Sequence, residues 1–200
     1  RRALRDGSSP SETAWRSFAR DSNRPCRARL THPHPSRNTS SIAMDGTDAL
    51  YASLKSASPF FLMAGPNVIQ SQEHIFRMCR SIKRVTDEVG IPLVFKSSFD
   101  KANRTSAKSF RGPGMDEGLK ILRAAKTTFD VPIVTDVHDA CQAEPVGTVA
   151  DVIQIPAFLC RQTDLLTAAA KTGRIVNVKK GQFCAASVMR NSVEKIRAAG

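Results

Sequence analysis

Basic and amide side chains follow several apolar segments of this sequence, at the point where each segment ends. The densest group occupies residues 96–111, where five basic residues and one acidic residue, Asp100, are interleaved with Ser, Thr and Asn. A single phosphate is held by a few charged donors. The surplus of cations therefore predicts a ligand set with two phosphate-type groups. The cations concerned are Lys96, Lys101, Arg104, Arg161, Lys179 and Lys180.

A structural explanation competes with this one for part of the set. Lys101, Arg104, Lys108 and Arg111 have a spacing that also fits one solvated face of a helix. Lys96 is different because it directly follows the apolar run 93–95 and is hard to place in bulk water. Lys179 and Lys180 are adjacent at a strand end, so alternation directs one of them inward and the other outward.

Acidic and amide residues at the ends of later apolar runs predict further contacts. Asp136 ends the run 133–135, and a carboxylate there is costly to bury without a partner. A lysine or a sugar hydroxyl is the expected partner. His138 and Cys141 follow it, but two potential ligands do not make a metal site. The sequence has no phosphate-binding loop of the Gly-x-x-x-x-Gly-Lys-Ser/Thr type, and no Gly-x-Gly-x-x-Gly follows its first apolar run.

The elements that must position these residues alternate along the chain. Short apolar runs predict strands at Phe60–Ala64, Pro92–Lys96, Pro132–Asp136, Val152–Ile155 and Ile175–Val178. Helical periodicity predicts helices over 48–56, 71–89 and 115–129, a helix with Thr163 as its N-cap that ends near Gly173, and a last helix that opens at Ser187. On the helix 71–89 the predicted buried face comprises Ile75, Met78, Cys79, Ile82, Val85 and Val89.

Strands that are apolar throughout and alternate with helices predict a parallel α/β sheet covered on both sides. Two architectures satisfy this pattern. A five-stranded doubly wound sheet is complete with these units. A (β/α)₈ barrel needs about 250 residues, so this chain would hold about five of its eight βα units. In either case the carboxyl ends of the strands form the face that carries an active site.

Charge is distributed unevenly over the chain. Of the formal net charge of +12, half comes from residues 1–43, which contain nine arginines, three acidic residues and no lysine. We expect this leader to be disordered, and to be either a transit-type peptide or sequence upstream of a native start at Met44. A nucleic-acid or membrane-surface arm is disfavoured, because Trp15 and Phe18 are its only aromatic residues. No apolar run is long enough to span a membrane, and five cysteines without a Cys-x-x-Cys pair favour a reduced compartment.

Five segments together resemble a known family. They are 95–106 (FKSSFDKANRTS), 109–114 (SFRGPG), 135–138 (TDVH), 154–164 (QIPAFLCRQTD) and 177–180 (NVKK). In this order they closely resemble the 3-deoxy-D-manno-octulosonate 8-phosphate synthases, also called 2-dehydro-3-deoxyphosphooctonate aldolases, and plant members above all. The resemblance runs from about residue 45 to residue 200. The segment Lys-Ala-Asn-Arg-Thr distinguishes this family from the related 3-deoxy-heptulosonate 7-phosphate synthases.

The resemblance implies a (β/α)₈ barrel, usually a homotetramer, in the cytoplasm or in an organelle if the leader is a targeting peptide. The family condenses phosphoenolpyruvate with arabinose 5-phosphate and water, and releases phosphate. Lys101 would lie between the substrates and donate a proton, and Asp136 and Gln154 would line the pocket. By the same resemblance, phosphoenolpyruvate would meet Lys96, Ser98, Ala157 and Lys179, and the pentose phosphate would meet Asn103, Arg104 and Thr105, with Arg161 a further candidate cation.

The residue at the position of Asn67 distinguishes two classes within the family. Metal-dependent members carry Cys at this position, and an amide is a poor ligand for a thiophilic divalent ion. The resemblance therefore implies the metal-independent class, with Asn67 in the active site and no cofactor. Because three barrel units would be missing after residue 200, we expect these 200 residues alone to be inactive and poorly soluble. The alternatives are a non-catalytic relative that binds sugar phosphates, and a heptulosonate synthase.

Overall fold

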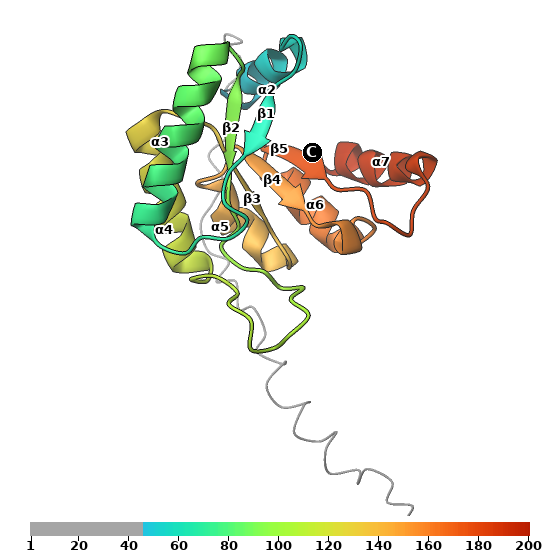
Figure 1. Cartoon of the computed structure of the whole chain (residues 1–200). Coiled ribbons are helices and arrows are strands. Elements are labelled where there is room, and N and C mark those ends of the chain that lie inside the picture. The colour runs from blue at the N-terminus through green and yellow to red at the C-terminus, as the bar shows by residue number, and fades with distance from the viewer. Residues whose placement is uncertain (1–45) are drawn as a thin grey trace, which may run out of the picture. The chain divides into compact units, whose positions relative to one another are not determined.

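The computed structural model describes residues 46–200, so the predicted leader 1–43 lies outside the described residues. Strands and helices alternate in this part of the chain (Figure 1). The strands are β1 Leu62–Ala64, β2 Leu93–Lys96, β3 Ile133–Asp136, β4 Val152–Ile155 and β5 Ile175–Val178. The α-helices are α2 Gly46–Ser56, α3 Gln72–Val89, α4 Met115–Phe129, α5 Ala143–Gly147, α6 Thr163–Lys171 and α7 Met189–Ala199. Single turns of 3₁₀ helix cover Ala140–Gln142, Ala157–Leu159 and Ala186–Val188.

The order of the strands decides between the two predicted architectures. All neighbouring strands are parallel, and their order in the sheet is β1-β2-β3-β4-β5. A doubly wound sheet reverses its order at a switch point, whereas a barrel adds each strand next to the preceding one. Figure 1 shows the sheet curled, with α3, α4 and α6 along its outer side. The five units therefore form part of a (β/α)₈ barrel, as the resemblance implies.

Alternation along each strand separates an outer core from an inner one. Outward residues such as Phe95, Ile133 and Ile153 pack against α3, α4 and α6 in what we call the helix-side core. Inward residues at the beginnings of β2, β3 and β4 form a small inner core of Val94, Val134 and Val152, which Leu54 of α2 also joins. The next inward positions are Lys96, Asp136 and Gln154. The concave face is thus apolar where the strands begin and polar where they end.

The ends of the strands differ from the prediction because of proline. Pro92 and Pro132 precede β2 and β3 rather than beginning them, since proline has no N–H to donate to a neighbouring strand. Their carbonyl groups still join the sheet: the N–H of Leu62 donates to Pro92 and that of Phe95 donates to Pro132, both at 2.8 Å. The first strand is shortened further, and Phe60 lies largely exposed before it.

The buried face predicted for α3 is partly wrong. Ile75 and Cys79 are buried and Ile82 packs against the helix-side core, but Val85 and Val89 are more than half exposed. Thr86 is buried in their place, with its hydroxyl donating to the carbonyls of Ile82 and Lys83. Thr86, rather than Val85, continues the 3.6-residue period of Ile75, Cys79 and Ile82, and Val89 is the last residue of the helix.

Three other local predictions are corrected. Residues 101–111 form an irregular loop, so the helical explanation for their cations is wrong. Thr163 is the first residue of α6 rather than its N-cap, and its hydroxyl accepts a hydrogen bond from Nζ of Lys195 at 2.8 Å. A 3₁₀ turn occupies residues 186–188, so the last α-helix begins at Met189 and not at Ser187. The short helix α5 was not predicted.

Among residues 46–200, no helix has the length and hydropathy that crossing a membrane requires.

Candidate active site

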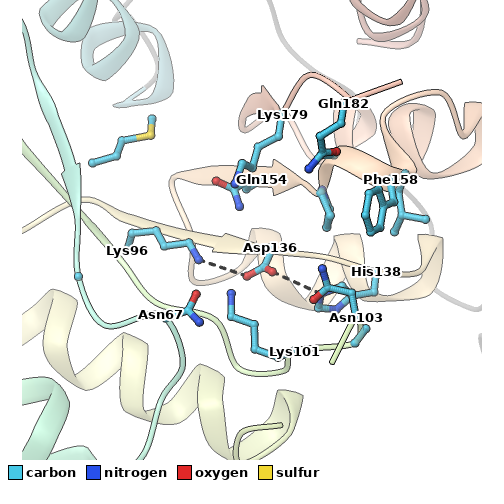
Figure 2. Close-up of a pocket in the computed structure, with 16 residues that line it drawn as sticks. Asn67, Lys96, Lys101, Asn103, Asp136, His138, Gln154, Phe158, Lys179 and Gln182 are labelled. Atoms are coloured by element: carbon cyan, nitrogen blue, oxygen red, sulfur yellow. Dashed lines mark ion pairs between the residues drawn. The ribbon is translucent and has the colours of Figure 1, made fainter. Parts of the chain in front are cut away.

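The polar inward positions open into a cavity of about 610 Å³ at the carboxyl ends of the strands. Side chains from the ends of β2, β3, β4 and β5 and from the loops that follow them point into it (Figure 2). Its lysine, aspartate and histidine lining residues are Lys96, Lys101, Lys179, Asp136 and His138, and its amide side chains are Asn67, Asn103, Gln154 and Gln182. Three lysines face a single carboxylate here. The cavity is therefore suited to anionic ligands.

Ser98 joins two of the lysines. Its Oγ accepts hydrogen bonds from Nζ of Lys96 at 2.7 Å and from Nζ of Lys101 at 2.8 Å. Ser98 is fully buried, and its carbonyl accepts a hydrogen bond from the N–H of Ile69, which holds the backbone in place. One hydroxyl thus keeps two ammonium groups, from the end of a strand and from the following loop, at the same edge of the cavity.

Lys96 is the least solvated of these lysines. Burial lowers its pKa to about 8, and the charges of Lys101 and Lys179 act in the same direction, while Asp136 opposes them. Its Nζ lies 3.8 Å from Oδ1 of Asp136, which is an ion pair without a direct hydrogen bond. An anionic ligand beside Lys96 would stabilise its charged form.

Asp136 is ionised although it is buried. Burial by itself would raise the pKa of this carboxyl group, but a hydrogen bond with His138 and the charge of Lys96 together hold the pKa well below its usual range. Oδ2 lies 3.3 Å from Nε2 of His138, whereas Oδ1 is buried and has no hydrogen-bond partner. A buried acceptor without a partner is unusual in a native structure. Oδ1 is therefore available to a hydroxyl group of a ligand.

His138 is held from two sides. Its backbone N–H donates to Oε1 of Gln142 at 2.8 Å, and its ring meets Phe99 edge-on with the ring centroids 6.0 Å apart. Nδ1 is buried and has no hydrogen-bond partner among the described residues. The imidazole thus fixes the orientation of the Asp136 carboxylate while keeping one ring nitrogen unused.

The strand β5 supplies the opposite wall. Asn177 lies beside Gln154 in the register of β4 and β5, and its Nδ2 donates to Oε1 of Gln154 at 3.3 Å. Lys179, two residues further on, points to the same side and lines the cavity. Nζ of Lys180 turns away to the carbonyls of Gly181 and Cys184, both at 2.9 Å. The prediction that only one of these adjacent lysines points inward is confirmed.

The predicted site residues divide into two groups. Those that line the cavity are Asn67, Lys96, Lys101, Asn103, Asp136, Gln154, Ala157 and Lys179, and Ser98 contacts two of them. Three others do not line it: Arg104 and Thr105 are exposed on the loop, and Arg161 is exposed after β4. Nε of Arg104 donates to the carbonyl of Phe110 at 3.2 Å. The roles predicted for all of these residues stay predictions.

Three polar residues of this region were not among the predicted site residues. They are His138, Asn177 and Gln182, of which the first and the last line the cavity. The two-residue period of a strand places the first two on the inward face. His138 lies two positions after Asp136, and Asn177 lies two positions before Lys179. Gln182 lies in an irregular segment, and no periodic signal points to it.

Residues 55–200 match the model of the DAHP synthetase I family. The chain is 71% identical over 157 residues to a 2-dehydro-3-deoxyphosphooctonate aldolase of Pisum sativum, which covers 78% of this chain and 54% of the relative. It is 55% identical over 142 residues to a protein of the same name from Pseudomonas putida. That alignment covers 71% of this chain and 50% of the relative. The chain spans about half the length of the curated relatives it matches, and the predicted resemblance is confirmed.

Proposed function

Because the chain belongs to the DAHP synthetase I family, we propose that the protein of which it forms at least a part condenses phosphoenolpyruvate with D-arabinose 5-phosphate and water. The products are 3-deoxy-D-manno-octulosonate 8-phosphate and inorganic phosphate. The observation that carries this proposal is the convergence of Lys96, Lys101 and Lys179 on one cavity that also contains an ionised carboxylate. The names of the relatives in pea and Pseudomonas putida support it.

The reaction needs both reactants to be held with their charges compensated. C3 of phosphoenolpyruvate attacks the aldehyde carbon of the pentose, which forms the new C–C bond, and the aldehyde oxygen takes up a proton. Water adds at C2 and loses a proton, and cleavage of the C–O bond then releases phosphate and leaves a ketone. Fixed cations stabilise the carboxylate and phosphate charges and align the two carbons before the attack.

The side chains of the cavity suit these tasks. Lys96 and Lys179 hold the carboxylate and phosphate of phosphoenolpyruvate from two walls of the cavity, with Ala157 beside them. Lys101 lies at the loop edge and donates the proton to the developing alkoxide. Asp136 offers its unpartnered Oδ1 to a hydroxyl group of the pentose. The phosphate of the pentose is bound by Asn103, Arg104 and Thr105 at the outer end of the loop.

A divalent metal ion is not part of this proposal. Asn67 lines the cavity at the position where metal-dependent members of the family have Cys, and its amide oxygen is a weak ligand for thiophilic ions. We expect activity to survive exhaustive chelation. Loss of activity that added divalent metal restores would overturn this part of the proposal.

The test is an assay of phosphate release with the complete gene product. Phosphate should be released from phosphoenolpyruvate when arabinose 5-phosphate is supplied, and should not be released when it is omitted. A preference for erythrose 4-phosphate would assign the protein to the heptulosonate synthases instead. Binding of sugar phosphates without turnover would indicate a non-catalytic relative.

We propose a homotetramer in the cytoplasm, and three largely exposed phenylalanines, Phe110, Phe158 and Phe183, offer apolar surface for subunit contacts. Light scattering on the purified protein tests the tetramer. Imaging of fluorescent fusions with and without residues 1–43 tests the location.

A further inference from the structure

The loop that connects β2 to α4 is closed at its base by a pair of charged residues. Nε of Arg111 donates to Oδ1 of Asp100 at 2.8 Å, and its Nη2 donates to the second carboxylate oxygen. Backbone hydrogen bonds join the same two segments: the N–H of Lys101 donates to the carbonyl of Arg111 at 2.8 Å, and the N–H of Gly114 donates to that of Phe99 at 3.1 Å. The chain therefore meets itself at the beginning and end of this loop.

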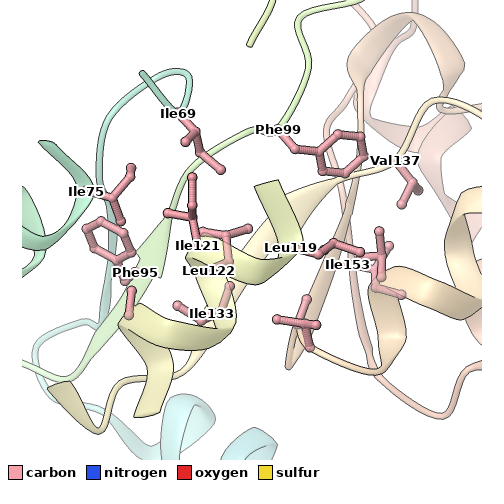
Figure 3. Packing of buried hydrophobic residues seen from close by; sticks show 14 of the residues in the cluster. Ile69, Ile75, Phe95, Phe99, Leu119, Ile121, Leu122, Ile133, Val137 and Ile153 are labelled. Atoms are coloured by element: carbon pink, nitrogen blue, oxygen red, sulfur yellow. The ribbon is translucent and has the colours of Figure 1, made fainter. Parts of the chain in front are cut away.

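The inner side of this base is anchored in the protein. Phe99 is buried in the helix-side core (Figure 3). Gly112 lies against it with a φ of +120°, and a Cβ atom there would be 2.3 Å from the carbonyl oxygen of Phe99. Only glycine allows so close a crossing of the two backbone segments. The base of the loop is thus placed by packing, and the ion pair lies at its outer edge.

Beyond the base, the loop has little support of its own. Residues 102–111 are all exposed, and their hydrogen bonds remain within the loop, as in that of Arg104 to Phe110. Yet Lys101 and Asn103 on the inner side of the loop line the cavity. The placement of these two side chains therefore depends on how firmly the base is closed.

The ion pair has the geometry that makes such contacts strong. Two parallel N–H···O contacts between guanidinium and carboxylate restrict both groups more than a single contact does. The carboxylate side is 19% exposed, so solvent screens it less than it screens the pairs on the helices. Arg111 itself does not line the cavity.

From this arrangement we propose that Asp100 and Arg111 are a positioning pair. The pair closes the loop between β2 and α4, residues 97–114, which we call the substrate loop, and it holds Lys101 and Asn103 in the cavity. The proposal rests on the proposed function for its consequence in catalysis. Neither side chain of the pair lines the cavity. Opening the base should weaken binding of the pentose phosphate, whose ligands the loop carries, and should leave phosphoenolpyruvate, held mainly from the strands, almost unaffected.

Limited proteolysis with trypsin tests whether the pair closes the loop, and it needs no assay of activity. The loop offers cleavage after Lys101, Arg104 and Lys108, and its cleavage requires local opening. In D100N we expect the initial rate of cleavage at these sites, followed by mass spectrometry, to rise about tenfold, because loss of the charged acceptor favours the open loop. D87N is the matched control, since Asp87 also accepts two contacts from one cation, Lys83 on α3.

A second variant guards against a fold defect in D100N. R111K keeps the charge at a side chain that is 55% exposed but replaces the two-point contact by a single one. We expect a rise in loop cleavage of about threefold, with an unchanged circular dichroism spectrum. Cleavage rates equal to those of the wild-type protein and D87N in both variants would overturn the proposal.

Steady-state kinetics on the complete gene product test whether closure of the loop supports binding of the pentose phosphate. In D100N the KM for arabinose 5-phosphate should rise about tenfold, while the KM for phosphoenolpyruvate should change less than about twofold. An equal rise in both constants would contradict a role confined to the substrate loop. If the wild-type protein itself fails to condense the two substrates, the proposed function is wrong, and the proteolysis result still decides whether the pair closes the loop.

Discussion

Two aspartates near opposite ends of the parallel strands have the same type of partner but opposite surroundings. Asp151 lies just before β4, where its Oδ1 accepts from Nζ of Lys126 at 2.7 Å and its Oδ2 accepts from the N–H of Ile133 at 2.9 Å. Asp136 ends β3, with Nζ of Lys96 at 3.8 Å from an oxygen that has no hydrogen-bond partner. Each carboxylate has a lysine nearby, but only Asp151 is fully satisfied.

Under the proposed function, this difference separates a structural role for Asp151 from a substrate-binding role for Asp136. A satisfied carboxylate ties two strands and a helix together at the end where the strands begin. An unsatisfied one costs stability, and proteins keep such groups where a ligand completes their hydrogen bonds. Among the described residues, four buried side-chain atoms have no hydrogen-bond partner. Two of them line the cavity, Oδ1 of Asp136 and Nδ1 of His138, and the other two belong to His74 and Thr135.

The largest expected effect comes from removing the lysine at each end. We expect K96M to lower kcat/KM by about 10² to 10³-fold, because a buried cation that stabilises charge in the transition state is lost. K126M should keep activity and lose about 1 kcal/mol of stability, since Lys126 is more than a third exposed. Phosphate-release kinetics and urea unfolding measure the two quantities. Equal losses of activity would contradict the division of roles.

The next effect concerns the satisfied carboxylate. We expect D151A to lower the free energy of unfolding by about 2 kcal/mol, because Ile133 N–H loses its buried acceptor and Lys126 loses its partner. Urea denaturation with an unchanged m-value would measure it. Activity of the folded variant should stay within about twofold of wild type. A stability unchanged by the substitution would show that this pair contributes nothing.

Two adjacent buried serines give a smaller and sharper comparison. Ser98 joins Lys96 and Lys101, whereas Ser97 donates to the carbonyl of Pro66 at 2.9 Å. We expect S98A to reduce kcat/KM about tenfold, because the two ammonium groups lose their common acceptor. S97A should instead cost about 1 kcal/mol of stability and leave kcat/KM nearly unchanged. A loss of kcat/KM in S97A but not in S98A would show that Ser98 has no role in the site.

The smallest effect is a dependence on pH. Since the pKa of Lys96 is lowered to about 8, its charge is lost as pH rises through this value, and kcat/KM should fall about tenfold between pH 7 and pH 9. The contribution of Lys96 to the free energy of unfolding should instead become more favourable as pH rises. The folded pKa lies below the unfolded value of 10.5, so the penalty for a buried charge is present below pH 8 and is relieved between pH 8 and 10.5.

Comparison with K96M isolates this contribution from other groups that titrate at high pH. The difference in the free energy of unfolding between wild type and K96M should move in favour of wild type by at most about 1.4 kcal/mol per pH unit over that range. A difference that does not vary with pH would contradict the lowered pKa of Lys96.

Residues close to the strands were the ones that the sequence predicted best. Lys96, Asp136, Gln154 and Lys179 each continue an apolar run, so the two-residue period already assigns them to one face. The loop was harder to predict. Lys101 and Arg104 have the same charge and similar neighbours in sequence, but only Lys101 lines the cavity, because hydrogen bonds between residues distant in the chain close the loop. Val85 and Val89 were also predicted wrongly, because Thr86 occupies the buried face beside Val85 and because the helix ends at Val89.

The alternation of apolar runs and helical periods by itself determined that this protein is a parallel α/β structure with its polar groups at the strand ends, because these patterns act over a few residues. Only the tertiary structure decided that the sheet curls, that one serine joins two lysines, and that Asp136 is left unsatisfied while Asp151 is not. These outcomes depend on which distant segments meet and at what distance, and the strength of a hydrogen bond or an ion pair is set by that distance and by burial.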